Sequence, residues 1–195
     1  ATDYYVDSSK ADDSGDGLSW ANAKKHISAA LGLISEPITD TLTIHLKGTV
    51  ASPQSYVDAT DQSLEIGGLH IREAAEVVIQ PEGWNQSNYE DNDDPYDEGG
   101  SWDPTATKPC TIPPLIINNA KPISLKGVKI AGGIGDAGIR ISECAMVNLD
   151  YCQIDGFADY GVEVDGLSIA EIINCYLSDN RMGVVGSENS VIIMI

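Results

Sequence analysis

Apolar residues in the C-terminal part of the chain recur at fixed spacing. The first set has apolar residues at offsets 0, 2, 5 and 7 from Ile123. The pattern begins again 24 residues later at Val147, and after a further 23 residues at Ala170. The sets are Ile123, Leu125, Val128 and Ile130; Val147, Leu149, Cys152 and Ile154; and Ala170, Ile172, Cys175 and Leu177. Such alternation is typical of a β-strand, and a fixed period indicates stacked repeats.

A second strand pattern repeats beside the first, in residues 137–141, 160–164 and 182–186. Its glycines, Gly138, Gly161 and Gly183, are 23 and 22 residues apart. Two or three short strands in each unit of about 22–24 residues predict one coil of a parallel β-solenoid, whose coils stack about 4.8 Å apart. A leucine-rich repeat has a similar period, but these units lack its Leu-x-x-Leu-x-Leu-x-x-Asn pattern. A β-sandwich gives no reason for a fixed period, and a doubly wound fold needs helices that are missing here. The expected fold class is therefore all-β.

The first 40 residues have a different pattern. A short strand over residues 3–6 precedes a polar loop rich in Asp and Gly over residues 7–17. An amphipathic helix is expected to begin near Trp20, with Ser19 as its cap and Pro37 ending it. Its apolar face would consist of Ala23, Ile27, Ala30, Leu31 and Ile34. Further strands are expected at residues 42–46, 63–66, 69–71 and 76–80.

The segment Tyr4–Trp20, followed by an amphipathic helix and a strand, resembles the opening of many secreted right-handed parallel β-helix proteins. That family includes pectate-lyase-like polysaccharide enzymes, surface proteins and phage tail spikes. In it, a strand, a polar loop and a short helix cover the N-terminal mouth of the solenoid, where strand edges and apolar core would otherwise be exposed. The resemblance implies a right-handed β-helix with an N-terminal amphipathic capping helix. It also implies an extracellular, cell-surface or virion location.

These patterns predict a single β-helix domain over residues 1–195. Residues 1–40 form its N-terminal cap, residues 84–110 an acidic loop insertion, and residues 114–195 the regular coils. The apolar strand Ser190–Ile195 has no cap after it. We therefore expect that end to be truncated or covered, by further coils of a longer chain or by another subunit.

Charge and hydropathy argue against two kinds of partner, nucleic acid and the membrane interior. Lys and Arg total 11 against 30 Asp and Glu, for a net charge of -19, which disfavours nucleic acid. No apolar run approaches the roughly 18 residues of a membrane span, so membrane insertion is not expected.

Cys152 and Cys175 share one inward column of the repeat, which predicts stacked small apolar groups. A disulfide between adjacent coils is the alternative.

The acidic loop offers two binding hypotheses. Its carboxylates are candidate Ca²⁺ ligands, because hard cations collect several oxygen atoms: Glu90, Asp91, Asp93, Asp94 and Asp97. A solvated acidic loop is the alternative. Its flat aromatic side chains are candidates for stacking on sugar rings: Trp84, Tyr89, Tyr96 and Trp102. They could equally anchor the loop to the coil wall.

The resemblance also implies where catalysis would occur. Pectate-lyase-like enzymes abstract a proton with an outward Lys or Arg beside Ca²⁺ held by carboxylates. Aligning the repeats pairs Lys126 with Asp150 and Arg140 with Glu163, and puts Arg181 near Asp136 and Asp159. This alignment favours opposite-charge ladders between coils. Lys126, Asp150 and Arg140 remain the candidate catalytic residues, since a Lys–Asp pair can also serve a β-elimination.

Two functions follow from these observations. The preferred hypothesis is a non-catalytic extracellular or surface scaffold, in an appendage, an adhesin or a phage tail protein. Polysaccharide is its candidate partner, and it requires no cofactor. A shortage of basic residues and the lack of a convincing carboxylate cluster among Asp150, Asp155 and Asp165 support it. The alternative is a Ca²⁺-dependent polysaccharide lyase or a glycoside hydrolase of the pectate-lyase-like class.

Overall fold

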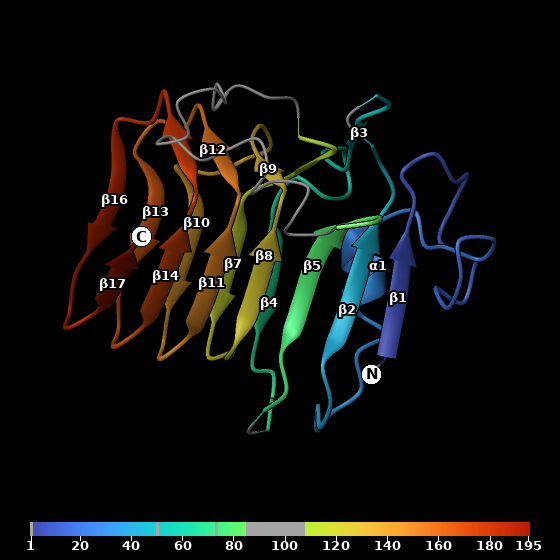
Figure 1. Cartoon of the computed structure of the whole chain (residues 1–195), viewed down its shortest axis with the longest axis horizontal. Coiled ribbons are helices and arrows are strands. Elements are labelled where there is room, and N and C mark those ends of the chain that lie inside the picture. Colours follow the sequence, from blue (N-terminus) through green and yellow to red (C-terminus); the bar gives the residue numbers. More distant parts are fainter. Residues whose placement is uncertain (1, 50, 73, 85–107) are drawn as a thin grey trace, which may run out of the picture.

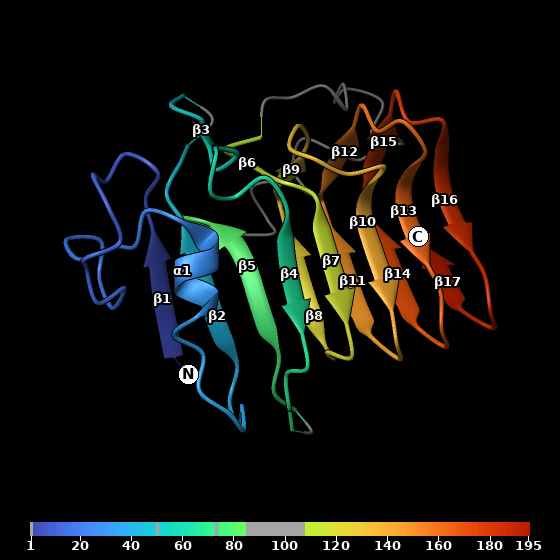
Figure 2. The same cartoon turned by 180° about the vertical axis from the view of Figure 1, so that it is seen from behind.

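The chain is built almost entirely from parallel β-strands. The structure, a computed structural model, describes residues 2–49, 51–72, 74–84 and 108–195. Strands account for 44% of it and helix for 3%, which confirms the prediction of an all-β chain. Figures 1 and 2 show the strands lying side by side along the long axis, with β1 near one end and β16 and β17 at the other.

The described strands form three parallel sheets. The first contains β1 (Thr2–Val6), β2 (Leu42–Leu46), β5 (Val77–Pro81), β8 (Ile123–Lys126), β11 (Met146–Asp150), β14 (Ile169–Ile173) and β17 (Val191–Met194), in that order. The second contains β4 (Leu64–Gly67), β7 (Leu115–Asn118), β10 (Ala137–Ser142), β13 (Tyr160–Val164) and β16 (Met182–Gly186). The third contains β3 (Gln54–Ser55), β6 (Cys110–Ile112), β9 (Lys129–Ile130), β12 (Gln153–Asp155) and β15 (Tyr176–Ser178).

From β2 onward the chain visits the three sheets in rotation, so each strand inside a sheet pairs with the strands one circuit earlier and one circuit later. Ile123 lies opposite Val147, and Val147 lies opposite Ala170. The spacing of 24 and then 23 residues found in the sequence is therefore the length of one circuit. The repeat prediction is confirmed in register as well as in period.

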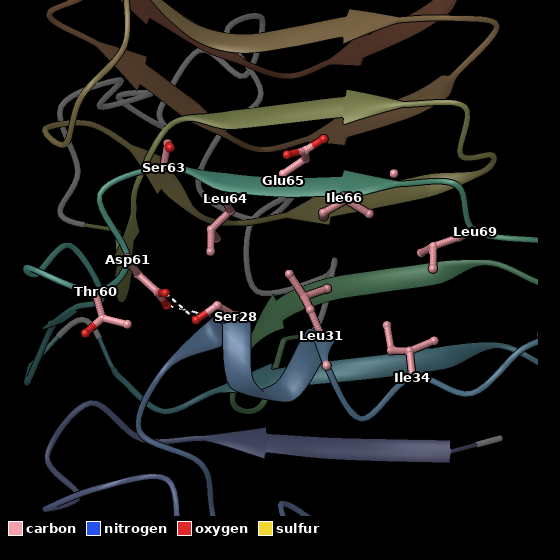
Figure 3. A pocket seen from close by; sticks show the side chains of 12 residues that line it. Ser28, Leu31, Ile34, Thr60, Asp61, Ser63, Leu64, Glu65, Ile66 and Leu69 are labelled. Atoms are coloured by element: carbon pink, nitrogen blue, oxygen red, sulfur yellow. Dashed lines mark hydrogen bonds between the residues drawn. The ribbon is translucent and has the colours of Figure 1, made fainter.

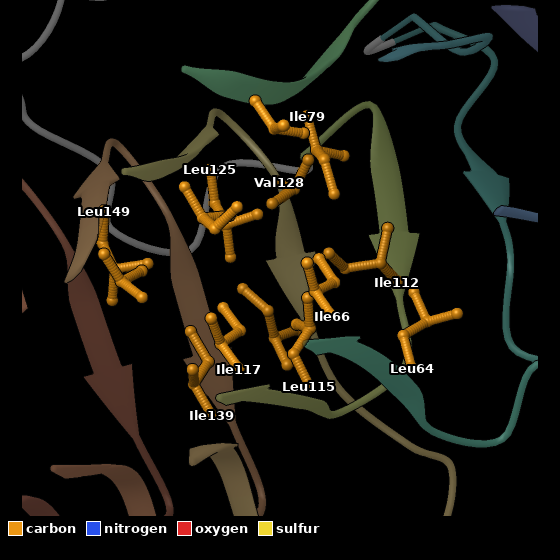
Figure 4. Close-up of a cluster of buried hydrophobic side chains, with 14 of the residues drawn as sticks. Leu64, Ile66, Ile79, Ile112, Leu115, Ile117, Leu125, Val128, Ile139 and Leu149 are labelled. Carbon is orange, nitrogen blue, oxygen red and sulfur yellow. The ribbon is translucent and has the colours of Figure 1, made fainter. Parts of the chain in front are cut away.

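Inward side chains from all three sheets form one continuous apolar core. Figure 4 shows Ile79, Leu125 and Leu149 of the first sheet facing Leu115 and Ile139 of the second. All five are at most 1% exposed. Each buried Leu or Ile contributes about 1.5–3 kcal/mol relative to an exposed one, so stacking circuits is what stabilises the fold.

Cys152 and Cys175 occupy the shared inward column that the repeat predicted. Cys152 is 1% exposed, and its N–H donates to the Cys175 Sγ atom at 3.4 Å. Both cysteines are free thiols, as are Cys110 and Cys144. This arrangement agrees with the prediction that Cys152 and Cys175 stack as small apolar groups.

The predicted amphipathic capping helix is wrong. Within the predicted helix, residues 20–36, only α1 (Ile27–Leu31) is helical, and its N-cap position is His26 rather than Ser19. Three of the five side chains expected on the apolar face, Ala23, Ile27 and Ala30, are nevertheless buried, and Leu31 and Ile34 are partly buried against the core. The short helix packs against β1 and β4.

Tertiary hydrogen bonds explain why residues 19–26 are not helical. The Asp13 carboxylate accepts the backbone N–H groups of Lys25 at 2.7 Å and His26 at 2.9 Å. Lys24 instead bridges to Val6 of β1, and Ser19 caps a tight turn by accepting the N–H of Asn22. Backbone groups held in these bonds cannot also form a helical ladder.

Two smaller strand predictions also need correction. Residues 69–71 are not a strand, because Ile71 forms only an isolated bridge with Ile38. The short strand β3 was not predicted, since two polar residues carry no alternating pattern. The expected strands near residues 3–6, 42–46, 63–66 and 76–80 are present as β1, β2, β4 and β5.

The two ends of the first sheet differ. At the β1 end, the Tyr5 N–H donates to the Gly17 carbonyl, and the Lys24 N–H donates to the Tyr5 carbonyl. The polar N-terminal loop thus satisfies the outer edge of β1. At the other end, β17 is an edge strand, and its Val191 and Met194 side chains are 48% and 61% exposed.

The glycine column of the second sheet yields a stability prediction. A Cβ atom at Gly138 would lie 2.6 Å from the Ile154 Cγ2 atom and 2.8 Å from the Gly161 carbonyl oxygen. At Gly183 the nearest atom would be 3.9 Å away.

Gly138→Ala should therefore lower the free energy of unfolding by about 1–3 kcal/mol through overpacking. Gly183→Ala, the matched control, should change it by less than about 0.5 kcal/mol. Urea unfolding measures both, and equal effects would contradict the close packing at Gly138.

Candidate functional site

Arg140, one of the candidate catalytic residues, is engaged in an ion pair. Its Nε atom lies 2.6 Å from the Glu163 Oε2 atom, and the two residues are direct partners on β10 and β13. The hydrogen bond to Glu163 raises the pKa of Arg140, so the guanidinium stays charged. The other candidates, Lys126 and Asp150, lie opposite each other on β8 and β11, as the repeat alignment predicted.

Two more cations pair between circuits. Arg181 contacts Asp159 with an Nη1–Oδ1 distance of 3.0 Å, which confirms the predicted pairing. Lys129 contacts Asp155 at 2.9 Å, and Ser178 donates its hydroxyl to the other oxygen of that carboxylate. The bond from Lys129 lowers the pKa of Asp155, because it stabilises the ionised form. These residues form ladders of opposite charge along the outer faces.

One predicted sugar-binding residue can be placed. Trp84 is half-buried, and its ring centroid lies 5.9 Å from that of the buried Tyr151, with the planes tilted by 54°. Trp84 therefore packs on the coil wall through at least part of its ring. The remaining aromatic candidates and the candidate Ca²⁺ ligands lie outside the described residues: Tyr89, Tyr96 and Trp102, and Glu90, Asp91, Asp93, Asp94 and Asp97.

No group of three or more His, Cys, Asp or Glu residues in residues 2–49, 51–72, 74–84 and 108–195 is arranged to hold a metal ion. Within the same ranges, no helix combines the length and apolarity needed to cross a membrane.

Sequence reasoning missed a cluster of charged residues around His26. The His26 Nδ1 atom lies 2.6 Å from the Asp13 Oδ2 atom, and its Nε2 atom lies 3.0 Å from the Asp58 Oδ2 atom. The imidazole thus joins the N-terminal loop to the segment before β4. With both ring nitrogens held by carboxylates, His26 has no nitrogen left to act as a general base. We call Asp13, His26 and Asp58 the His26 clamp.

The pKa values in the His26 clamp are shifted to favour the charged forms. Partial burial lowers the pKa of His26, but the bonds and charges of Asp13 and Asp58 outweigh it and raise the pKa above 6.5. For Asp13, burial acts to raise the pKa, and the bonds from His26 and Lys25 lower it below 3.8. For Asp58, the N–H groups of Asp61 and Thr60 and the contact with His26 lower it below 3.8.

Asp61 fixes the start of α1 beside this clamp. Its carboxylate is 1% exposed and accepts the N–H of Ile27 at 2.8 Å and the hydroxyl of Ser28. A helix start has backbone N–H groups without intrahelical partners, and here a residue from a distant loop satisfies them. Asp61 and the His26 clamp together hold α1 against the strand that follows, β4.

A groove of about 330 Å³ lies between α1 and β4, which is in the size range of small ligand sites. Figure 3 shows Thr60, Asp61 and Ser63 at one end, and Leu31, Ile34 and Leu69 toward the other. The groove is therefore polar where the chain enters β4 and apolar where it leaves. We call it the α1–β4 groove.

In comparisons with known proteins, no protein-family model, curated protein or solved structure matches the chain.

The His26 clamp predicts how stability depends on pH. Because the pKa of His26 is raised, its contribution is complete below pH 6.5 and is lost as pH rises through the raised value. Because the pKa values of Asp13 and Asp58 are lowered, their contributions are present above pH 3.8 and are lost as pH falls through the lowered values. The clamp should therefore stabilise the fold most between pH 3.8 and 6.5.

In the unmodified chain, the free energy of unfolding should decrease between about pH 5 and about pH 8. In His26→Gln this decrease should be smaller, because the contribution of the charged imidazole is absent at both pH values. His70→Gln, at an exposed position, is the control and should keep the full loss. Urea unfolding at the two pH values gives both quantities. An unchanged pH dependence in His26→Gln would show that the clamp does not contribute.

Proposed function

We propose that this chain is a right-handed parallel β-helix that acts as a non-catalytic scaffold outside the cytoplasm, in a surface appendage, an adhesin or a phage tail. Consecutive strands belong to the three parallel sheets in turn, and this chain path supports the assignment of a β-helix. Right-handedness is the expectation for such a path, because about 98% of connections between parallel strands of one sheet have that hand.

The pairing of basic side chains is the observation that carries the scaffold proposal. Proton abstraction requires a basic group that reaches the substrate in its deprotonated form. Lys129, Arg140 and Arg181 instead neutralise carboxylates on neighbouring circuits. Opposite-charge pairs between neighbouring strands stabilise the stack by about 0.2–1 kcal/mol each, and Arg140 and Glu163 lie directly opposite each other. The role of these three side chains on the outer faces is thus structural.

Polysaccharide is the partner we propose for this scaffold. The net charge of -19 favours a neutral glycan, or an acidic one bridged by Ca²⁺. Trp84 supports the proposal because its half-buried ring is anchored on Tyr151 and keeps exposed surface. An aromatic ring held in this way binds a sugar face with little loss of side-chain entropy.

The scaffold proposal predicts binding without turnover. Incubation with neutral and acidic polysaccharides, with and without Ca²⁺, should produce no unsaturated or new reducing ends. Affinity electrophoresis in gels containing the same glycans should show retardation. Trp84→Ala should weaken the affinity about fivefold, as expected when roughly 1 kcal/mol of stacking is lost. Trp20→Ala is the matched control, since Trp20 packs on Tyr5 near the N-terminal loop. Release of new chain ends would overturn the scaffold role, and retardation unaffected by Trp84→Ala would remove Trp84 from the binding surface.

A further inference from the structure

The strand β4 has a neighbour on one side only, whereas the inner strands β7, β10 and β13 of its sheet are paired on both sides. It is the edge of the second sheet, where the order runs β16-β13-β10-β7-β4. Between β1 and β2 the chain forms the polar loop and α1 in place of strands in the second and third sheets. The α1–β4 groove therefore lies where one more strand of the second sheet would begin.

The backbone of β4 presents unpaired groups to this groove. The Leu64 N–H donates to the Pro114 carbonyl at 2.8 Å, and the Gly68 N–H donates to the Asn118 carbonyl at 3.2 Å, so both bonds point to β7. In a parallel ladder, alternate residues of a strand bond to opposite neighbours. The N–H and C=O groups of Glu65 and Gly67 consequently point away from β7, into the α1–β4 groove.

The side chains around these groups select a class of ligand. Leu31 and Ile34 of the α1 side and Leu69 beyond β4 provide an apolar wall. Among the described residues, no Lys, Arg or His lines the groove. Glu65 is one of its lining residues, and the exposed Glu65 carboxylate accepts a hydrogen bond from Asn118 of β7. The matching ligand has alternating backbone donors and acceptors, apolar side chains and positive charge.

We propose that the α1–β4 groove binds an extended basic peptide, which pairs with β4 as an added strand of the second sheet. The Glu65 and Gly67 amides donate to peptide carbonyls, and the Glu65 and Gly67 carbonyls accept peptide N–H groups. A groove of about 330 Å³ holds about three residues of extended chain, roughly 10 Å long. Strand addition of this kind derives affinity from the main chain and specificity from the flanking side chains.

A peptide fits this edge better than a glycan does. The exposed backbone groups of Glu65 and Gly67 repeat every two residues, about 6.6 Å along the strand, which is the repeat of an extended peptide. Sugar hydroxyl groups follow no such alternation of donors and acceptors. The site is therefore separate from the polysaccharide surface proposed above, and the two proposals can fail independently.

The probe for the test is acetyl-Lys-Ile-Lys-Val-Lys-amide, compared with a copy that carries N-methyl groups on its three central amides. The N-methyl copy keeps every side chain and the charge but cannot donate from those amides. With ¹⁵N-labelled protein, the unmodified peptide should shift the Glu65 and Gly67 amide signals in a saturable way and slow their hydrogen exchange. The N-methyl copy should bind at least about tenfold more weakly, because the ladder bonds are lost.

A pair of protein variants tests the same bonds from the other side. Glu65→Pro removes an N–H that points into the α1–β4 groove and is not used by β7, a substitution that edge strands accept. Glu65→Ala removes the same carboxylate and its contact with Asn118 but keeps the N–H. Glu65→Pro should bind the peptide at least about tenfold more weakly than Glu65→Ala, with circular dichroism confirming that both are folded.

Three results would overturn the proposal. The first is that the N-methyl copy binds as tightly as the unmodified peptide. The second is that Glu65→Pro and Glu65→Ala bind the unmodified peptide equally tightly. The third is that millimolar peptide does not shift the Glu65 and Gly67 amide signals. If Glu65→Pro does not fold, the comparison of the two peptides in the unmodified protein still decides. Shifts of the same two amides by a neutral oligosaccharide without any response to the peptide would assign the groove to a sugar instead.

Discussion

Pairing of each strand with its counterpart one circuit away is the constraint on which the rest of this structure depends. One inward column runs through Leu42, Val77, Ile123, Val147, Ala170 and Ile192, each residue directly opposite the next. Side chains alternate between the two faces of a strand, so a shift of one residue would turn the whole column outward. Backbone pairing and burial are therefore satisfied by the same register, which also brings Arg140 beside Glu163.

The same constraint makes the N-terminal region the place where the fold needs special solutions. A repeat satisfies its own edges only between two other repeats, and the first circuit has a neighbour on one side. At β1, the carbonyl of Gly17 and the N–H of Lys24 complete the ladder. At β4, α1 stands beside the edge without pairing to it, held there by Asp61 and the His26 clamp. The edge of the first sheet at β1 thus bonds to backbone groups of the N-terminal loop, whereas the edge of the second sheet at β4 is covered only by side chains.

This difference explains what the sequence could and could not predict. The coils repeat a local signal, alternation with a fixed period, so strand positions, register and the Arg140–Glu163 pair follow from alignment of the chain with itself. The capping helix was predicted from equally good local spacing, yet residues 19–26 are held in other conformations by Asp13 and by β1. The His26 clamp joins residues 13 and 32 positions apart, at no spacing that marks a motif. Tertiary contacts that occur once leave no periodic trace.

Function should therefore be sought where the repeat is interrupted. In the regular circuits, Lys129 and Arg140 pair with carboxylates, the inward side chains form the core and the inner strands are paired on both sides, which leaves few groups for a ligand. The α1–β4 groove combines backbone groups that need partners with an apolar wall and a carboxylate, because β4 is the first strand of its sheet. Departures from local consistency are expected at functional sites, since a binding surface must keep some interactions unsatisfied until its ligand arrives. By that reasoning, the short helix matters less as a lid on the core than as the second wall of a site.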